Sequence, residues 1–221
     1  MALEIEILPD PAAVAERGAE IVAEQAGAAV ADYGEFTFAV SGGHTPWAML
    51  AELYGRLPWD KVTIFQVDER VAPEDDPDRN LTHLLRSLPA GGAADVREMP
   101  VWAHDLEAAA AIYAQALPDA LDLVHLGLGP DGHTASLVPS DPVLDVTDRA
   151  VAVTGVYQGR RRMTLTYPAL DRARQVLWLV TGADKADALR RLRDGDSTIP
   201  AARVTAKNAL LLADEAAAGR R

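Results

Sequence analysis

One histidine of this chain directly follows a cluster of glycines. Residues 122–140 read DLVHLGLGPDGHTASLVPS, an apolar run followed by three glycines and then His133. The pattern predicts a buried strand over residues 121–128 and a tight turn that presents the imidazole at the strand's carboxyl end. Ligands bind at that end of the strands in open α/β sheets. We therefore expect His133 to do chemistry as a proton acceptor. The alternative is a histidine that only hydrogen-bonds the backbone.

A second glycine-containing turn follows another predicted strand, residues 36–40. Between that strand and the next helix lie Ser41, Gly42, Gly43, His44 and Thr45. We expect Thr45 to cap the helix. Two glycines allow backbone N–H groups to converge, and a helix N-terminus adds positive potential, so the turn suits a phosphate. An ordinary strand–helix turn is the alternative. The Gly-Lys-Ser/Thr sequence of a Walker loop is absent from residues 41–45.

Charged side chains follow other predicted strands. Asp68, Glu69 and Arg70 begin a long polar loop, residues 68–80, where they could orient a sugar or position a water molecule. The alternative for them is a solvated loop start. Arg162 ends a run of three arginines, and Lys185 follows another strand end. Each of these two cations could face an anionic ligand or solvent.

Several other chemistries fit the sequence poorly. The spacing of Gly127, Gly129 and Gly132 matches the dinucleotide fingerprint, but Asp131 would place negative charge where a pyrophosphate lies, and Pro139 interrupts the following helix. The remaining histidines show no metal-binding spacing, and cysteine is absent from the chain. No serine lies in a Gly-x-Ser-x-Gly elbow, which disfavours a Ser-His-Asp hydrolase. We expect no metal site.

Strand-like and helix-like segments alternate along the chain, which predicts an α/β fold with a mostly parallel sheet and helices on both faces. Predicted strands cover residues 3–8, 36–40, 61–67, 121–128, 176–180 and 210–212. Predicted helices cover residues 11–32, 45–56, 103–117 and 184–193. The length of 221 residues fits a single domain, residues 1–221. We expect the Ala/Arg tail after Asp214 to be frayed.

The composition restricts the partners. The net charge of −12 argues against general nucleic-acid binding, so an anionic substrate would need a local concentration of positive charge. Arginine greatly outnumbers lysine and is the better anion clamp. No apolar run reaches the length of a membrane span, and the first ten residues resemble a first strand rather than a signal peptide. We expect a cytoplasmic protein.

Taken together, these motifs resemble the 6-phosphogluconolactonases, in the superfamily that includes the glucosamine-6-phosphate isomerases and deaminases. The matching segments, in the family's order, are SGGHTP (41–46), VDER (67–70), GLGPDGHTASLVPS (127–140), RMTLT (162–166) and TGADK (181–185). After His133 the isomerases continue with an Ala-Phe-Asn-Glu type of sequence, whereas this chain has Thr-Ala-Ser-Leu. His44, His125, Val138 and residues 157–161 depart from the usual lactonase pattern.

The resemblance implies a modified Rossmann-like fold, no organic cofactor, and hydrolysis of 6-phospho-D-glucono-1,5-lactone in the oxidative pentose phosphate pathway. His133 would be the general base, Asp131 would orient it, and Arg70 or backbone N–H groups would stabilise the oxyanion. Asp68 is a further candidate catalytic residue. The phosphate would sit on the Ser41–Thr45 turn, with charge from Arg162 and Lys185.

Two rival functions remain on the sequence alone. One is a sugar-phosphate isomerase or deaminase on the same fold. The other is a non-catalytic sugar-phosphate sensor, although such proteins usually carry a DNA-binding module for which this chain has no basic helix. We expect a small-molecule partner, no nucleic acid or membrane, and a monomer or weak homodimer.

Overall fold

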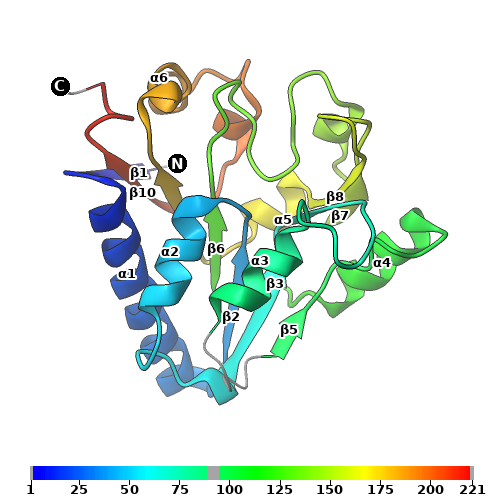
Figure 1. Cartoon of the computed structure of the whole chain (residues 1–221), viewed down its shortest axis with the longest axis horizontal. Coiled ribbons are helices and arrows are strands. Elements are labelled where there is room, and N and C mark those ends of the chain that lie inside the picture. The colour runs from blue at the N-terminus through cyan, green and yellow to red at the C-terminus, as the bar shows by residue number, and fades with distance from the viewer. Residues whose placement is uncertain (1, 89–94, 220–221) are drawn as a thin grey trace.

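The centre of the molecule is a parallel sheet. The computed structural model describes residues 2–88 and 95–219, and within them seven strands lie side by side, every neighbouring pair parallel (Figure 1). In spatial order they are β1 (Ala2–Leu8), β10 (Asn208–Asp214), β9 (Gln175–Val180), β6 (Leu123–Leu126), β2 (Phe36–Val40), β3 (Val62–Gln66) and β5 (Asp95–Arg97). The predicted α/β fold with a mostly parallel sheet is confirmed.

The strand order reverses direction at the middle of the sheet. β2 and β6 are neighbours there, with Phe38 opposite Leu123. From β2 the chain continues outward to β3 on one side, and from β6 it continues to β9 on the other. The connections that leave the carboxyl ends of two such strands diverge and open a crevice where ligands bind. The turns that begin at Ser41 and Gly127 follow these two strands, so the topology places both motifs at this crevice.

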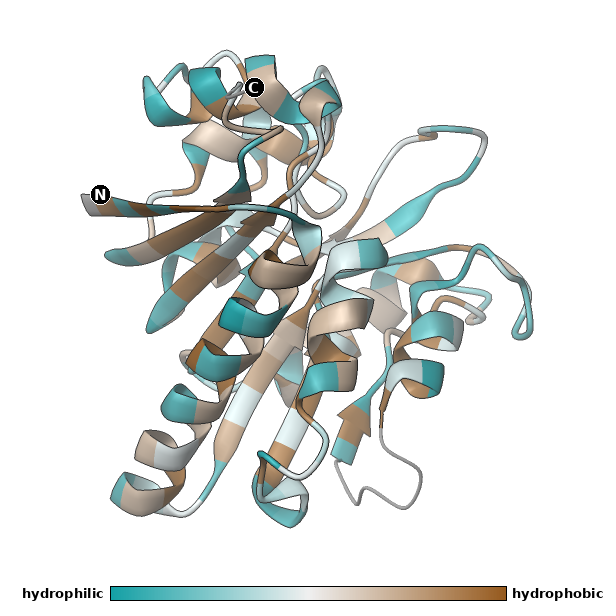
Figure 2. Cartoon of the chain, turned by 60° about the vertical axis from the view of Figure 1, so that its left-hand side comes forward, coloured by the Kyte–Doolittle hydropathy of each residue, from teal (hydrophilic) through white to brown (hydrophobic). Residues whose placement is uncertain are grey.

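Both faces of the sheet are buried, because most of its central strands are apolar at consecutive positions. Phe36 and Phe38 of β2 pack on one face with α1 (Pro11–Tyr33), α2 (His44–Glu52) and α3 (Asn80–Ser87). The other face packs against α4 (Leu106–Ala116), α5 (Tyr167–Asp171) and α6 (Ala186–Arg193). Figure 2 shows the apolar strands beside helices on which hydrophilic and apolar positions alternate.

A second, smaller sheet was not predicted. In the described part of the chain it comprises β4 (Asp68–Arg70), β8 (Arg162–Leu165) and β7 (Val151–Val153), in that order and antiparallel. Arg70 lies opposite Arg162 and Asp68 lies opposite Thr164. The segment predicted as a long polar loop therefore begins as a strand of this sheet, and it ends where α3 begins. This pairing carries Arg162 to the same place as Asp68 and Arg70.

The predicted helices differ from the observed ones mainly at their ends. α1 begins after Asp10, whose carboxylate accepts the backbone N–H of Ala13, and it ends at Gly34 with φ of 90°. α2 ends at Glu52, four residues earlier than expected. A separate 3₁₀ turn precedes α6. The 3₁₀ turns are Trp59–Lys61, Pro142–Asp145, Ala183–Lys185 and Pro200–Arg203.

The expectation of a frayed tail is wrong for residues 215–219. Ala217 is buried there, and its backbone N–H donates to the Asp214 carboxylate at 2.7 Å. Residues 220–221, the last of the predicted tail, lie outside the described residues. Within the described ranges, none of the helices combines the length and the apolar character that crossing a bilayer requires.

Candidate active site

A cleft of about 450 Å³ opens at the carboxyl ends of the central strands. Its volume lies within the range of small-molecule sites. The predicted site residues that line it are Ser41, Gly42, Gly43, His44, Thr45, Asp68, Arg70, His133, Arg162 and Lys185. Of the predicted residues, Asp131 and Glu69 stay off the cleft surface, and Asp131 lies directly behind His133. The fold thus brings residues from five separate segments of the chain to one opening.

His133 and Asp131 form a close pair within a single turn. Gly132 between them has φ of 83°, which lets the chain fold back so that Asp131 Oδ1 lies 2.6 Å from His133 Nδ1 and 3.2 Å from the His133 backbone nitrogen. Burial raises the pKa of Asp131, but the charge and hydrogen bonds of His133 outweigh burial and leave that pKa below its ordinary value. An ionised carboxylate can only accept a hydrogen bond, so in the neutral form of the ring the proton lies on Nδ1 and the free lone pair on Nε2.

The glycines of this turn are required by close packing. A Cβ at Gly129 would lie 2.1 Å from His133 Nδ1, and a Cβ at Gly132 would lie 2.5 Å from the Cβ of Ile199. Residues 133–141 form turns and an isolated bridge, with no helix after the glycines. The fingerprint spacing is therefore explained by the seating of His133, and the helix N-terminus that a dinucleotide pyrophosphate needs does not follow it.

The Ser41–Thr45 turn is fixed to strand β6. The Ser41 backbone N–H donates to Nδ1 of the buried His125 at 3.3 Å, and Ser41 Oγ donates to the His125 carbonyl at 3.1 Å. The expectation that Thr45 caps the helix is wrong. α2 begins at His44 after Gly43, and Thr45 Oγ1 instead lies 2.8 Å from Thr181 Oγ1. The N-terminus of α2 still brings positive potential to the cleft.

Cationic side chains supply the positive charge that an anionic ligand would need. Arg162 is 5% exposed, and its guanidinium carbon lies over the ring of Tyr157, 5.0 Å from the ring centroid. Burial lowers the pKa of Arg162, and the charge of Asp68 opposes that effect. Arg70 Nη1 donates to the carbonyl of Asp78. Lys185 also lines the cleft, paired with Asp184 at 2.8 Å.

Asp68 is a buried carboxyl at the cleft floor. Its Oδ2 accepts a hydrogen bond from Ser136 Oγ at 2.6 Å. Burial raises the pKa of Asp68, while the Ser136 hydrogen bond and the charges of Arg162 and Arg70 lower it. The net direction is upward, so this carboxyl holds a proton more readily than an exposed aspartate. Asn80 Nδ2 donates to the Asp68 carbonyl at 2.9 Å and fixes the backbone there.

Glu69 has a structural position, so both predicted alternatives for it are wrong. Its side chain is fully buried and accepts the backbone N–H groups of Asn80 and Leu81, each at 2.8 Å, at the start of α3. Gln66 Nε2 donates to the same carboxylate, and Gln66 Oε1 accepts the Met99 N–H. Glu69 thereby joins the strand that carries Asp68 and Arg70 to the N-terminus of α3.

Sequence analysis missed Asn80 and Tyr157. Asn80 lines the cleft, but it follows a polar loop with no spacing that would mark it. Tyr157 contacts both Asp131 and the His133 ring, from a hairpin that no turn signal in the prediction identified. In both cases the partner lies more than ten residues away in the chain. Within the described ranges, no group of three or more His, Cys, Asp or Glu side chains could hold a metal ion.

Comparison with known proteins places this geometry in a family. A family model described as glucosamine-6-phosphate isomerases/6-phosphogluconolactonase matches residues 9–212. The chain belongs to this family. The 6-phosphogluconolactonase of Nostoc sp. is 34% identical to this chain, and the alignment covers 97% of this chain and 96% of the relative. The resemblance drawn from the motifs is confirmed.

Solved structures show that the family fold is shared by two kinds of enzyme. A 6-phosphogluconolactonase from Shewanella baltica superposes with a TM-score of 0.86 at 24% identity, covering 96% of this chain and 97% of that one. A monomeric glucosamine-6-phosphate deaminase also has a TM-score of 0.86, at 19% identity, covering 99% and 100%. The fold therefore does not separate the two branches of the family, and the choice depends on the site residues.

Proposed function

We propose that this protein hydrolyses 6-phospho-D-glucono-1,5-lactone to 6-phospho-D-gluconate, with His133 as the general base. The reaction is the lactonase step of the oxidative pentose phosphate pathway. The observation that carries the proposal is the cleft itself, which is lined by an imidazole backed by a carboxylate, by the glycine-containing Ser41–Thr45 turn and by Arg162. Relatives named 6-phosphogluconolactonase that match nearly the whole chain support the same choice.

The proton transfers follow from the tautomer of His133. Its Nε2 accepts a proton from a water molecule as the water oxygen bonds to the lactone carbonyl carbon, and Asp131 stabilises the resulting imidazolium. The ring C–O bond then breaks, and the departing sugar oxygen takes the proton back from Nε2. The carboxylic acid product ionises in solution. A δ-lactone is an activated ester, so a positioned base supplies much of the required acceleration, about 10²–10⁴-fold.

The charged groups divide into two roles in this proposal. Arg70 or backbone N–H groups of the glycine turn stabilise the oxyanion that develops on the carbonyl oxygen. The Ser41–Thr45 turn, Arg162 and Lys185 bind the phosphate, which does not react. Asp68 lies close enough to the two arginines for their charges to act on its carboxyl. Anchoring the remote phosphate orients the reacting end of the sugar and converts binding free energy into rate.

The rival function is an isomerase or deaminase on the same fold. The residues after His133 are Thr-Ala-Ser-Leu, and Ser136 of this segment donates to Asp68, which ties the lactonase-type sequence to the cleft floor. Incubation with glucosamine 6-phosphate separates the two functions, because deamination releases ammonia. We expect none above a no-enzyme control.

A pH-stat assay on the freshly prepared lactone, corrected for spontaneous hydrolysis, tests the proposal. Wild-type protein is expected to accelerate acid release, and His133→Ala to lower kcat by about 10²–10⁴-fold with KM changed only a few-fold. Arg162→Ala is expected mainly to raise KM. The control is His104→Ala, an exposed histidine that does not line the cleft. Full turnover by His133→Ala would remove this residue from the mechanism.

A further inference from the structure

The side chain of Tyr157 contacts both the His133–Asp131 pair and Arg162. Its hydroxyl donates to Asp131 Oδ2 at 3.0 Å, while the other oxygen of that carboxylate bonds His133. Its ring packs edge-on against the His133 imidazole, with centroids 5.6 Å apart. The same ring lies under the Arg162 guanidinium at 5.0 Å. One side chain thus contacts the predicted base, the carboxylate behind it and a cation predicted to bind phosphate.

A closed hairpin holds Tyr157 in this position. Tyr157 and Arg160 exchange backbone hydrogen bonds at 3.0 and 3.2 Å, and the two residues between them, Gln158 and Gly159, both have positive φ. That geometry is typical of two-residue hairpin turns. Gln158 is strained there, because a side chain disfavours positive φ.

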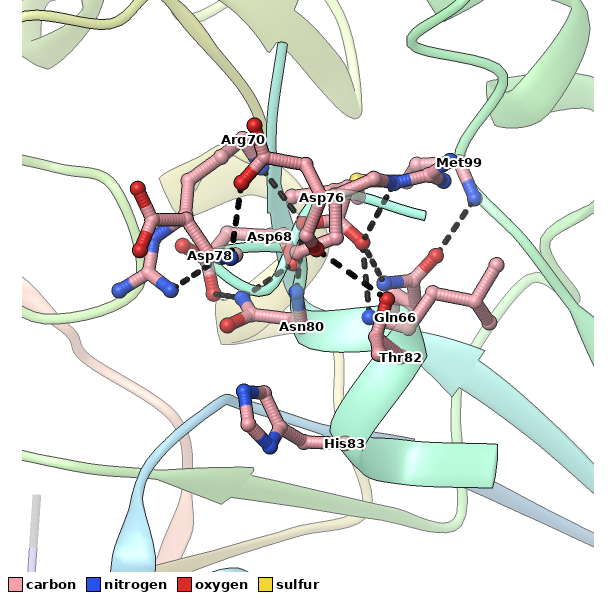
Figure 3. Close-up of polar contacts among 12 residues, drawn as sticks. Gln66, Asp68, Arg70, Asp76, Asp78, Asn80, Thr82, His83 and Met99 are labelled. Atoms are coloured by element: carbon pink, nitrogen blue, oxygen red, sulfur yellow. Dashed lines mark hydrogen bonds and ion pairs between the residues drawn. The ribbon is translucent and has the colours of Figure 1, made fainter. Parts of the chain in front are cut away.

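Ion pairs connect the hairpin to the loop that carries Asp76 and Asp78. Arg160 Nη2 lies 2.9 Å from Asp76 Oδ2 and 3.3 Å from Asp78 Oδ2. The Asp78 carbonyl also accepts from Arg70 (Figure 3). One loop therefore contacts both the hairpin and a cleft arginine. At the base of the hairpin, Arg162 Nη2 donates to Gln158 Oε1 at 3.2 Å. The position of Tyr157 is therefore fixed from both ends of the turn.

We infer that Tyr157 is a positioning residue that couples the proton-transfer pair to the anion-binding arginine. Its hydroxyl orients the Asp131 carboxylate so that Oδ1 stays on His133 Nδ1. Its ring face holds the Arg162 guanidinium, whose Nε has no hydrogen-bond partner among the described residues. The two tasks use different parts of the side chain, so two substitutions separate them. The inference rests on the proposed function and assigns a further residue to it.

Tyr157→Phe removes the hydroxyl and keeps the ring. We expect kcat on the lactone to fall about tenfold, the value of one hydrogen bond to a charged group, with KM within twofold of wild type. Tyr157→Leu removes the ring as well. It should lose the same factor in kcat and also weaken binding of the product 6-phosphogluconate about fivefold by calorimetry, because the contact between the ring and Arg162 is lost.

The matched control is Tyr54→Phe. Tyr54 is 74% exposed and does not line the cleft, so its hydroxyl should have no effect on kcat or on product binding. A wild-type kcat in Tyr157→Phe would overturn the inference. Equal losses of kcat and product affinity in Tyr157→Phe, together with a lower melting temperature, would also overturn it, since they would indicate a purely structural role.

A spectroscopic readout separates this inference from the proposed function. In proton NMR the hydrogen-bonded Nδ1–H of His133, assigned by its absence in His133→Asn, should shift in Tyr157→Phe and stay in place in Tyr54→Phe. If wild-type protein failed to hydrolyse the lactone but this resonance still shifted, the proposed function would fall and the positioning role would stand. An unshifted resonance in active protein would refute the positioning role alone.

Discussion

The buried His125 makes the stability of this protein depend on pH in a way that can be calculated. The side chain is fully buried in β6, and burial lowers its pKa from 6.5 to about 3. The folded protein therefore keeps the ring neutral over the whole range from pH 7 to pH 4. An unfolded imidazole takes up a proton below about pH 6.5. The unfolded state binds more protons in that range, so the free energy of unfolding falls as the pH falls.

The magnitude follows from the separation of the two pKa values. Each pH unit below the unfolded pKa costs about 1.4 kcal/mol, because one pKa unit is equivalent to that free energy. Between pH 7 and pH 5 the contribution of His125 amounts to about 2 kcal/mol. That is a large fraction of the 5–15 kcal/mol by which native proteins are typically stable, about a thirtyfold change in the unfolding equilibrium.

Urea unfolding at pH 7 and at pH 5 measures this contribution by comparison with non-titrating variants. His125→Leu fills the site with an apolar side chain, and His125→Asn keeps an acceptor for the Ser41 N–H. Both are expected to lose about 2 kcal/mol less than wild type when the pH is lowered. Their absolute stability at pH 7 does not enter the comparison. Carboxylates contribute equally to all the proteins and cancel.

The exposed His104 supplies the control. His104→Gln should show the same loss between pH 7 and pH 5 as wild type. If His125→Leu and His125→Asn also kept the full wild-type loss, the ring would not be held neutral in the folded state, and the reasoning from burial would be refuted.

Two further predictions concern residues that position the site. Gly129→Ala puts a methyl group 2.1 Å from His133 Nδ1, so kcat on the lactone should fall at least tenfold, whereas the exposed helical Gly27→Ala, whose Cβ meets nothing within 4 Å, should retain activity. Unchanged turnover in Gly129→Ala would contradict the tight seating of the imidazole. Glu69→Ala leaves backbone donors of α3 and the buried Arg79 guanidinium unpaired, and should lower the free energy of unfolding by about 3–5 kcal/mol in urea titrations. A loss below 1 kcal/mol would show that the carboxylate is not structural.

Local patterns were sufficient for the parts of the fold that are determined locally. β2 has the predicted bounds because its mostly apolar residues lie between Gly34 and a glycine-containing turn. The turn that carries His133 was predicted because glycines concentrate where the chain must fold back on itself. Neighbouring carboxyl ends of parallel strands then bring His133 and Ser41 to one crevice, which is a rule of topology.

Long-range pairing was beyond the sequence. Nothing in the composition of Asp68–Arg70 shows that it pairs with Arg162–Leu165, about ninety residues later, so the small antiparallel sheet was missed. Glu69 was misjudged for the same reason. An acidic residue in a polar stretch suggests solvent, but its partners are backbone donors eleven and twelve residues away that become neighbours only when α3 packs. Tyr157 depends on a hairpin whose strained Gln158 carries no turn preference.

His133, the proposed base, and Asp131, the carboxylate proposed to orient it, are separated by a single glycine and share one turn. The groups expected to bind the phosphate lie on elements of two different sheets and in distant parts of the chain. A small displacement of one sheet relative to the other would widen or narrow the opening and leave the distance within the turn unchanged. In the proposed function, the position of the phosphate and the pairing of the base with its carboxylate are therefore determined by different parts of the fold.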